Sequence, residues 1–180
     1  MNKLLPLALI LLLAVPSLAQ SELGITFEED MIVNSLVFGI GAFSSYVYIQ
    51  TDEAMSIAAY ECSIELSSAQ LFVLNVTGPN GWTNFGDGTN HLVGFQTPLP
   101  VGPDGWVVVC TMDFLLTEPG TWIVLEVGAA TPSSFDPPTP GFANGINPDI
   151  LVPCSAQSGY INDEFAVEGM SLTQVKALFD

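Results

Sequence analysis

The chain has 180 residues, of which 19 are Asp or Glu, two are Lys or Arg and one is His, so its formal net charge at pH 7 is −17. A surface with so few cations cannot neutralise phosphate groups, which argues against nucleic acid and anionic lipid surfaces as partners. A chain of this length is expected to form one domain with a substantial core.

The first residues predict a secretory signal peptide, residues 1–19. Lys3 precedes an apolar stretch over residues 4–15, and the small residues Ser17 and Ala19 follow it. This order is typical of a leader that is cut after Ala19. The stretch is shorter than the roughly 20 residues that span a bilayer, and no second apolar run follows. We therefore expect the chain to be secreted to the periplasm or the extracellular space, with no membrane insertion after cleavage and with Lys176 as its only remaining basic side chain.

Short β-rich runs between Gly, Pro and Asn predict that most of the remaining chain is strand, because helical periodicity is almost absent. The predicted strands are residues 32–38, 46–50, 58–66, 71–76, 91–95, 106–116, 122–127 and 150–152. Strands of this number and spacing predict an all-β fold, an antiparallel, immunoglobulin-like β-sandwich of about eight to nine strands over residues 20–159.

Two of the predicted strands alternate apolar and polar residues and carry a cysteine on the apolar side. The first apolar face holds Tyr60, Cys62, Ile64 and Leu66, and the second holds Val108, Cys110, Met112 and Phe114. Both faces are expected to point into the sandwich. The tryptophans Trp106 and Trp122, which begin apolar strands, are also expected in the core.

The three cysteines allow at most one disulfide within a monomer. Cys62 and Cys110 are the best pair, because both lie on inward faces of long strands and an exported chain meets an oxidising compartment. The alternative is that both are simply small buried apolar side chains. Cys154 would then be a free thiol, either buried or joined to another chain.

The end of the chain changes character. Residues 129–145 are rich in Pro and small side chains and are expected to form a long loop. Residues 160–180 are expected to form a tail with a short amphipathic helix, because Ser171 and Gln174 have the spacing of a capping box. The apolar side of this helix would hold Leu172, Val175, Leu178 and Phe179.

The sequence offers little for catalysis, and we predict no catalytic residue and no enzyme activity. The only histidine, His91, has no nucleophile motif around it and is expected to be a surface or turn residue. The cysteines lack a C-x-x-C pair, so a structural zinc site is not expected. A glycoside hydrolase would need two facing carboxylates, and no pair among the acidic residues stands out by its spacing.

Three segments with oxygen ligands, residues 27–30, 86–90 and 144–149, could bind calcium. The candidate ligands in the last two are Asp87 and Asn90, and Asn147 and Asp149. None of the segments matches an EF-hand loop, and the alternative is that these residues only form turns. We expect no other cofactor and no other metal site.

Trp82 follows a Pro-Asn-Gly turn and is the aromatic residue expected to be most exposed. It could stack on a carbohydrate or anchor a protein partner. The alternative is that it packs over the end of the sandwich.

The order of several segments resembles the cohesin-like β-sandwich over roughly residues 32–128. These segments are AAYECSIEL (58–66), LFVLNVTGPNGW (71–82), HLVGFQTPLPVGPDGWVVVCTMDFLL (91–116) and GTWIVLEVG (120–128). Three other segments resemble uncharacterised secreted proteins of poorly cultured Gram-negative bacteria: TPLP (97–100), PGFANGINPDILVPCSAQSG (140–159) and QVKALF (174–179). The resemblance implies an exported sandwich with a part in extracellular assembly. Cohesins bind dockerins through a strand face whose residues have no match here, so dockerin binding is not carried over.

These features predict a secreted, non-catalytic module that recognises a protein or carbohydrate partner through loops around Trp82 or through a face of the sandwich. The alternative is a structural subunit of an extracellular assembly. In that case Cys154 or the predicted C-terminal helix would make the contact between chains, and the protein would be an oligomer. The alternative for the helix is that Leu172, Val175 and Leu178 pack on their own domain.

Overall fold

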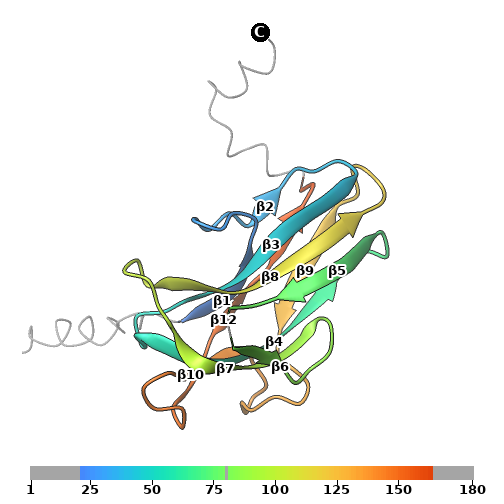
Figure 1. Cartoon of the computed structure of the whole chain (residues 1–180). Coiled ribbons are helices and arrows are strands. Elements are labelled where there is room, and N and C mark those ends of the chain that lie inside the picture. Colours follow the sequence, from blue (N-terminus) through green and yellow to red (C-terminus); the bar gives the residue numbers. More distant parts are fainter. Residues whose placement is uncertain (1–20, 80, 164–180) are drawn as a thin grey trace, which may run out of the picture.

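Two β-sheets that face each other form the part of the chain that the structure, a computed structural model, describes: residues 21–79 and 81–163 (Figure 1). These residues contain strands and no helix, and therefore no helix that could cross a membrane. The strands are β1 (Glu22–Thr26), β2 (Ser35–Leu36), β3 (Gly41–Gln50), β4 (Ser56–Leu66), β5 (Leu71–Thr77), β6 (Trp82–Asn84), β7 (Asn90–Pro100), β8 (Trp106–Leu116), β9 (Ile123–Gly128), β10 (Gly141–Asn144), β11 (Leu151–Pro153), β12 (Ser155–Gln157) and β13 (Gly159–Ile161).

The first sheet has the order β12-β1-β3-β8-β5. The second has the order β11-β10-β4-β9-β13-β2, with β7 paired to β4 and β6 paired to β7. Most neighbours are antiparallel, but β1 pairs with β12 and β13 pairs with β2 in parallel. The predicted all-β sandwich is therefore confirmed, while its sheets are mixed and not purely antiparallel. The signal peptide and the C-terminal helix expected from the sequence lie outside the described residues.

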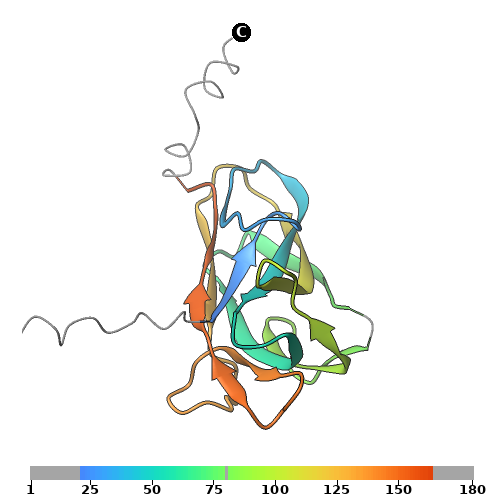
Figure 2. The same cartoon turned by 90° about the vertical axis from the view of Figure 1, so that its left-hand side faces the viewer.

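All eight predicted strands overlap strands of the structure, and five others were not predicted. The missed strands are β1, β6, β10, β12 and β13. β10 lies inside residues 129–145, where a loop was expected, and β13 extends the sandwich beyond residue 159. Figure 2 shows the last described part of the chain, which begins with β10 and β11 at the lower end of the sandwich and runs upward through β12 and β13.

Apolar side chains from both sheets meet between the layers and form one core. The face predicted for β8 is correct for Met112 and Phe114, which are fully buried. It is wrong for Val108, because a β-bulge shifts the pairing: Val47 of β3 pairs with Cys110, whereas the next residue pairs with Val108. The extra residue, Val109, is buried in place of Val108.

The tryptophans expected in the core lie at its edge. Trp122 is 59% exposed because it precedes β9, which begins only at Ile123. Trp106 is half-buried and packs edge-on against Tyr48, with ring centroids 6.4 Å apart. An apolar side chain at the beginning of a strand is therefore not buried by that position alone.

Candidate functional site

The outer face of β4 is hollow because small residues lie side by side there. β4 pairs with β10 along one edge and with β7 along the other. In one row of this register Ala59 lies between Ala143 and Gly94, and in the next row Glu61 lies between Gly141 and Leu92. Because side chains alternate along a strand, both rows face away from the core, and the first has no side chain larger than a methyl group.

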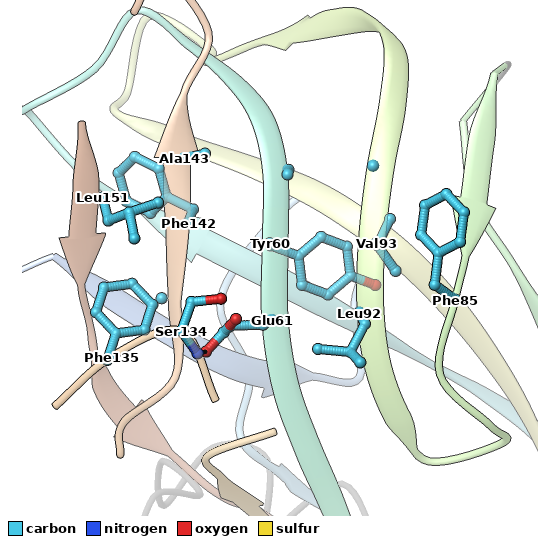
Figure 3. A pocket seen from close by; sticks show the side chains of 13 residues that line it. Tyr60, Glu61, Phe85, Leu92, Val93, Ser134, Phe135, Phe142, Ala143 and Leu151 are labelled. Carbon is cyan, nitrogen blue, oxygen red and sulfur yellow. Dashed lines mark hydrogen bonds between the residues drawn. The ribbon is translucent and has the colours of Figure 1, made fainter. Parts of the chain in front are cut away.

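Aromatic and aliphatic side chains stand around this floor and turn it into a groove with a volume of about 280 Å³ (Figure 3). Phe85, in the turn between β6 and β7, stands on one side and is 77% exposed. Phe135, from the loop between β9 and β10, and Leu151 of β11 stand on the other. We call this site the β4 groove.

Glycine at position 141 lets Phe135 lie over β10. A Cβ atom at this position would collide with the Phe135 ring and would lie 2.5 Å from the carbonyl oxygen of Val152. At Gly94, by contrast, a Cβ atom would lie 3.8 Å from the Phe85 ring, an ordinary contact distance. The Phe135 wall of the β4 groove thus requires glycine at position 141, whereas the Phe85 wall does not require glycine at position 94.

Glu61 places a carboxylate in the β4 groove. Its side chain is only 8% exposed, and Oε1 accepts hydrogen bonds from Ser133 Oγ at 2.9 Å and from the Ser134 amide at 2.7 Å. The same loop is held at Thr131, whose amide and carbonyl bond the side chain of Asn90 at 2.9 and 2.8 Å. Within the described part of the chain, Oε2 of Glu61 accepts no hydrogen bond and remains available to a ligand.

The histidine expected at the surface is fully buried, which corrects the prediction. β7 begins at Asn90, so His91 already belongs to a strand and pairs with Cys62 of β4. Its Nδ1 lies 3.1 Å from the hydroxyl of Tyr60, and its Nε2 has no hydrogen-bond partner among the described residues. Burial lowers the pKa of His91 to about 4 and raises that of Tyr60 well above its ordinary value.

The structure contains no disulfide between Cys62 and Cys110: both residues and Cys154 are free thiols. All three are buried in the core, as small apolar side chains would be. Burial raises the pKa of the Cys62 thiol and raises those of Cys110 and Cys154 to about 12. Cys154 is 3% exposed, so its position does not suit a link to another chain.

We expect a thiol reagent such as DTNB to modify none of the three cysteines readily while the protein is folded, because the thiols are buried and stay protonated at pH 8. In guanidinium chloride without reductant, all three should react. A single reactive thiol in the unfolded chain would instead show a disulfide. Chains with Cys62→Ser or Cys154→Ser serve as controls and should each lose one equivalent.

Trp82 does not provide the exposed ring expected from the sequence. Its side chain is half-buried and packs against the core, and its indole nitrogen is buried. It therefore follows the alternative, a tryptophan that closes the end of the sandwich. The exposed aromatic of the same segment is Phe85, three residues later.

The four residues considered for calcium lie in two separate turns. Asp87 and Asn90 close the turn before β7, where the Asn90 amide bonds the Asp87 carbonyl at 2.6 Å. The Asn90 side chain makes one hydrogen bond through each end of its amide, and both go to Thr131. Asn147 Oδ1 accepts a bond from the Asp149 amide at 3.3 Å in the β10–β11 turn. Within residues 21–79 and 81–163, no three His, Cys, Asp or Glu side chains are placed to hold a metal ion.

The described body carries no Lys or Arg at all, since the two basic residues are Lys3 and Lys176. Acidic side chains even lie opposite each other: Glu65 of β4 pairs with Glu126 of β9, and both are exposed. Like charges in this arrangement repel each other. The body thus presents a surface of one sign to any partner.

Comparison with known proteins identifies the fold. No protein-family profile and no curated protein sequence matches the chain. Among solved structures, the sixth cohesin of scaffoldin B from Acetivibrio cellulolyticus, in complex with a Cel5 dockerin mutant, is similar with a TM-score of 0.56 and 12% identity, over 81% of this chain and 99% of that one.

A non-cellulosomal cohesin from the archaeon Archaeoglobus fulgidus is similar with a TM-score of 0.51 and 12% identity, over 85% of this chain and 100% of that one. The cohesin module of a family 33 glycoside hydrolase from Clostridium perfringens is similar with a TM-score of 0.50 and 12% identity, over 81% and 100%. Likeness at such low identity concerns the fold alone. The chain has the cohesin-like β-sandwich fold.

Proposed function

We propose that this chain is a non-catalytic protein-interaction module and that it holds its partner protein in the β4 groove. The observation that carries the proposal is the groove itself, a hollow on a sheet face. Phe85, 77% exposed, stands at one rim, and Leu151, 45% exposed, stands at the other. Aromatic side chains that are exposed beside a pocket are typical of sites where proteins meet.

The shape of the β4 groove suits side chains of a protein. Its floor is formed by backbone and small residues of paired strands, and such a floor is more rigid than a loop. A volume of about 280 Å³ can take two or three side chains that project from one segment. The partner's segment would replace water on Phe85, Phe135 and Leu151, and this loss of apolar surface would drive binding.

The similar fold supports a protein partner over other classes. The Acetivibrio cellulolyticus cohesin was solved in complex with a dockerin, so a sandwich of this shape can present a face to another protein. We do not propose a dockerin as the partner of this chain, because the two sequences are only 12% identical. The predicted signal peptide supports a partner outside the cytoplasm, and we propose that the protein acts in the periplasm or beyond.

The chemistry of the β4 groove favours binding over catalysis. Glu61 is the only acidic residue among the side chains that line it, and glycoside hydrolysis needs two carboxylates. Tyr60 and His91 are almost fully buried, and the hydroxyl of Tyr60 is engaged with the imidazole of His91. A glycoside hydrolase would need a second acidic group in this hollow, so we do not propose that activity.

We expect Phe85→Ala to weaken partner binding about tenfold or more, since exposed aromatics at a pocket rim commonly carry this much binding energy. The partner is first captured from the secreted proteins of the source organism, purified, and measured by calorimetry. Phe72→Ala is the matched control, because Phe72 is 51% exposed on the other sheet.

Equal affinity of the wild type and the Phe85→Ala chain would place the contact elsewhere and would contradict the groove as the binding site. Binding to an oligosaccharide array, with no protein captured, would contradict the proposed class of partner. Because Phe85 lies largely in solvent, its loss should leave the stability of the sandwich unchanged.

A further inference from the structure

We propose that the C-terminal segment, residues 164–180, docks in the β4 groove of its own molecule, with the ammonium group of Lys176 against the carboxylate of Glu61. The groove is apolar, is open to solvent and contains one carboxylate oxygen without a hydrogen bond in the described part of the chain. Such a site is best filled by a cation with apolar neighbours.

Charge makes this segment the natural occupant within the chain. After the predicted cleavage, Lys176 is the only Lys or Arg, so no other side chain of the chain can form a lysine or arginine ion pair with Glu61. Glu61 is the one carboxylate that is both poorly hydrated and placed in the groove. An ion pair that is partly shielded from water is worth more than one at an open surface.

The neighbours of Lys176 match the walls of the groove. The sequence around it is QVKALF, residues 174–179, in which Lys176 is the only charged side chain. The acidic residues of the segment, Glu164, Glu168 and Asp180, lie outside this stretch. Val, Leu and Phe side chains can therefore cover Phe85 and Leu151 while the lysine stem lies along the apolar floor.

The chain is long enough to reach. Asn162 is fixed at the far end of the sandwich by bonds to the Phe38 amide and to the Thr121 carbonyl. From Ile161 the pairing through β9 to β4 places Glu61 about seven positions along the strands and two strands across, a distance of roughly 25 Å. The residues from 164 to 175 span up to roughly 40 Å when extended. Figures 1 and 2 show the two ends of this path, β13 and β2 at the top and β10 at the bottom.

Docking within one molecule is favoured over docking on a second copy. A covalent connection of about a dozen residues gives the segment an effective concentration in the millimolar range, far above that of a second chain in dilute solution. Two copies of this acidic protein also repel each other. If the proposed function holds, the segment competes with the partner protein for the same site, and this consequence alone rests on that proposal.

A carbodiimide crosslink tests the contact in the whole mature chain, residues 20–180. This reagent joins a carboxylate to an amine that touches it, and Lys176 carries the only side-chain amine. We expect Lys176 to be joined mainly to Glu61, within a monomer, as read by electrophoresis and mass spectrometry of peptides. Lys176 joined mainly to the exposed Glu65 or to the nearby Glu164 and Glu168 would overturn the proposal.

Phe85→Ala removes a wall of the groove and leaves every carboxylate in place, so it should lower the yield of the Lys176–Glu61 product about tenfold. Phe72→Ala, on the other sheet, should leave the yield unchanged. An unchanged yield in Phe85→Ala would overturn the proposal, and a Lys176–Glu61 product found in dimers would overturn docking within one molecule. None of these results requires a partner protein, so a failed crosslink and a failed partner titration can be told apart.

Discussion

Phe114→Ala should destabilise the folded chain by about 3–5 kcal/mol, the usual cost of removing a large aromatic side chain from a close-packed core. Phe114 lies near the C-terminal end of β8 and is fully buried. Its ring stacks on that of Phe43, with centroids 5.5 Å apart and planes inclined by 22°. Truncation would leave a cavity between the sheets and take from Phe43 its stacking partner.

Such a loss is a large share of the stability of a typical domain, about 5–15 kcal/mol. Urea unfolding followed by circular dichroism measures it, and the midpoint should fall while the slope is unchanged. Phe72→Ala is again the control, because its side chain is 51% exposed and should cost little. A loss below about 1 kcal/mol for Phe114→Ala would mean that the core is not packed as described.

The long strands could be predicted because their apolar residues alternate over many positions. β4 and β8 each span 11 residues, which is enough for the period of two to stand out. β1 could not be predicted in this way, since four of its five residues are buried and no alternation remains. β10, only four residues long, lies among prolines, and its pairing with β4 decides its conformation.

The β4 groove depends on register, which the sequence does not show. Ala59 and Gly94 are ordinary small residues until pairing places them side by side with Ala143. The one signal in the sequence is the alternation around Tyr60, because a period of two places Glu61 on the face opposite Tyr60 and Cys62. The exposed ring of the segment was assigned to Trp82, but turn geometry turns that ring inward and leaves Phe85 in solvent.

Acidification should destabilise the sandwich through His91. The ordinary pKa of 6.5 falls to about 4 in the folded chain because burial disfavours the imidazolium form. His91 therefore becomes protonated below about pH 6.5 in the unfolded chain, but only near pH 4 in the folded chain. The unfolding free energy is therefore not reduced by His91 above pH 6.5. It falls as the pH is lowered, by about 3 kcal/mol at pH 4.

The carboxylates titrate in the same range, so the effect of His91 must be isolated by comparison. We expect urea unfolding of the wild type to lose about 3 kcal/mol more than His91→Gln between pH 7 and pH 4. Glutamine can still bond the Tyr60 hydroxyl, and the comparison uses the dependence on pH and not the absolute stability, so a weaker core in the variant does not disturb it. Parallel pH profiles for the two chains would show that His91 is charged as easily in the folded state as in the unfolded one. That result would contradict its placement, fully buried, beside Tyr60.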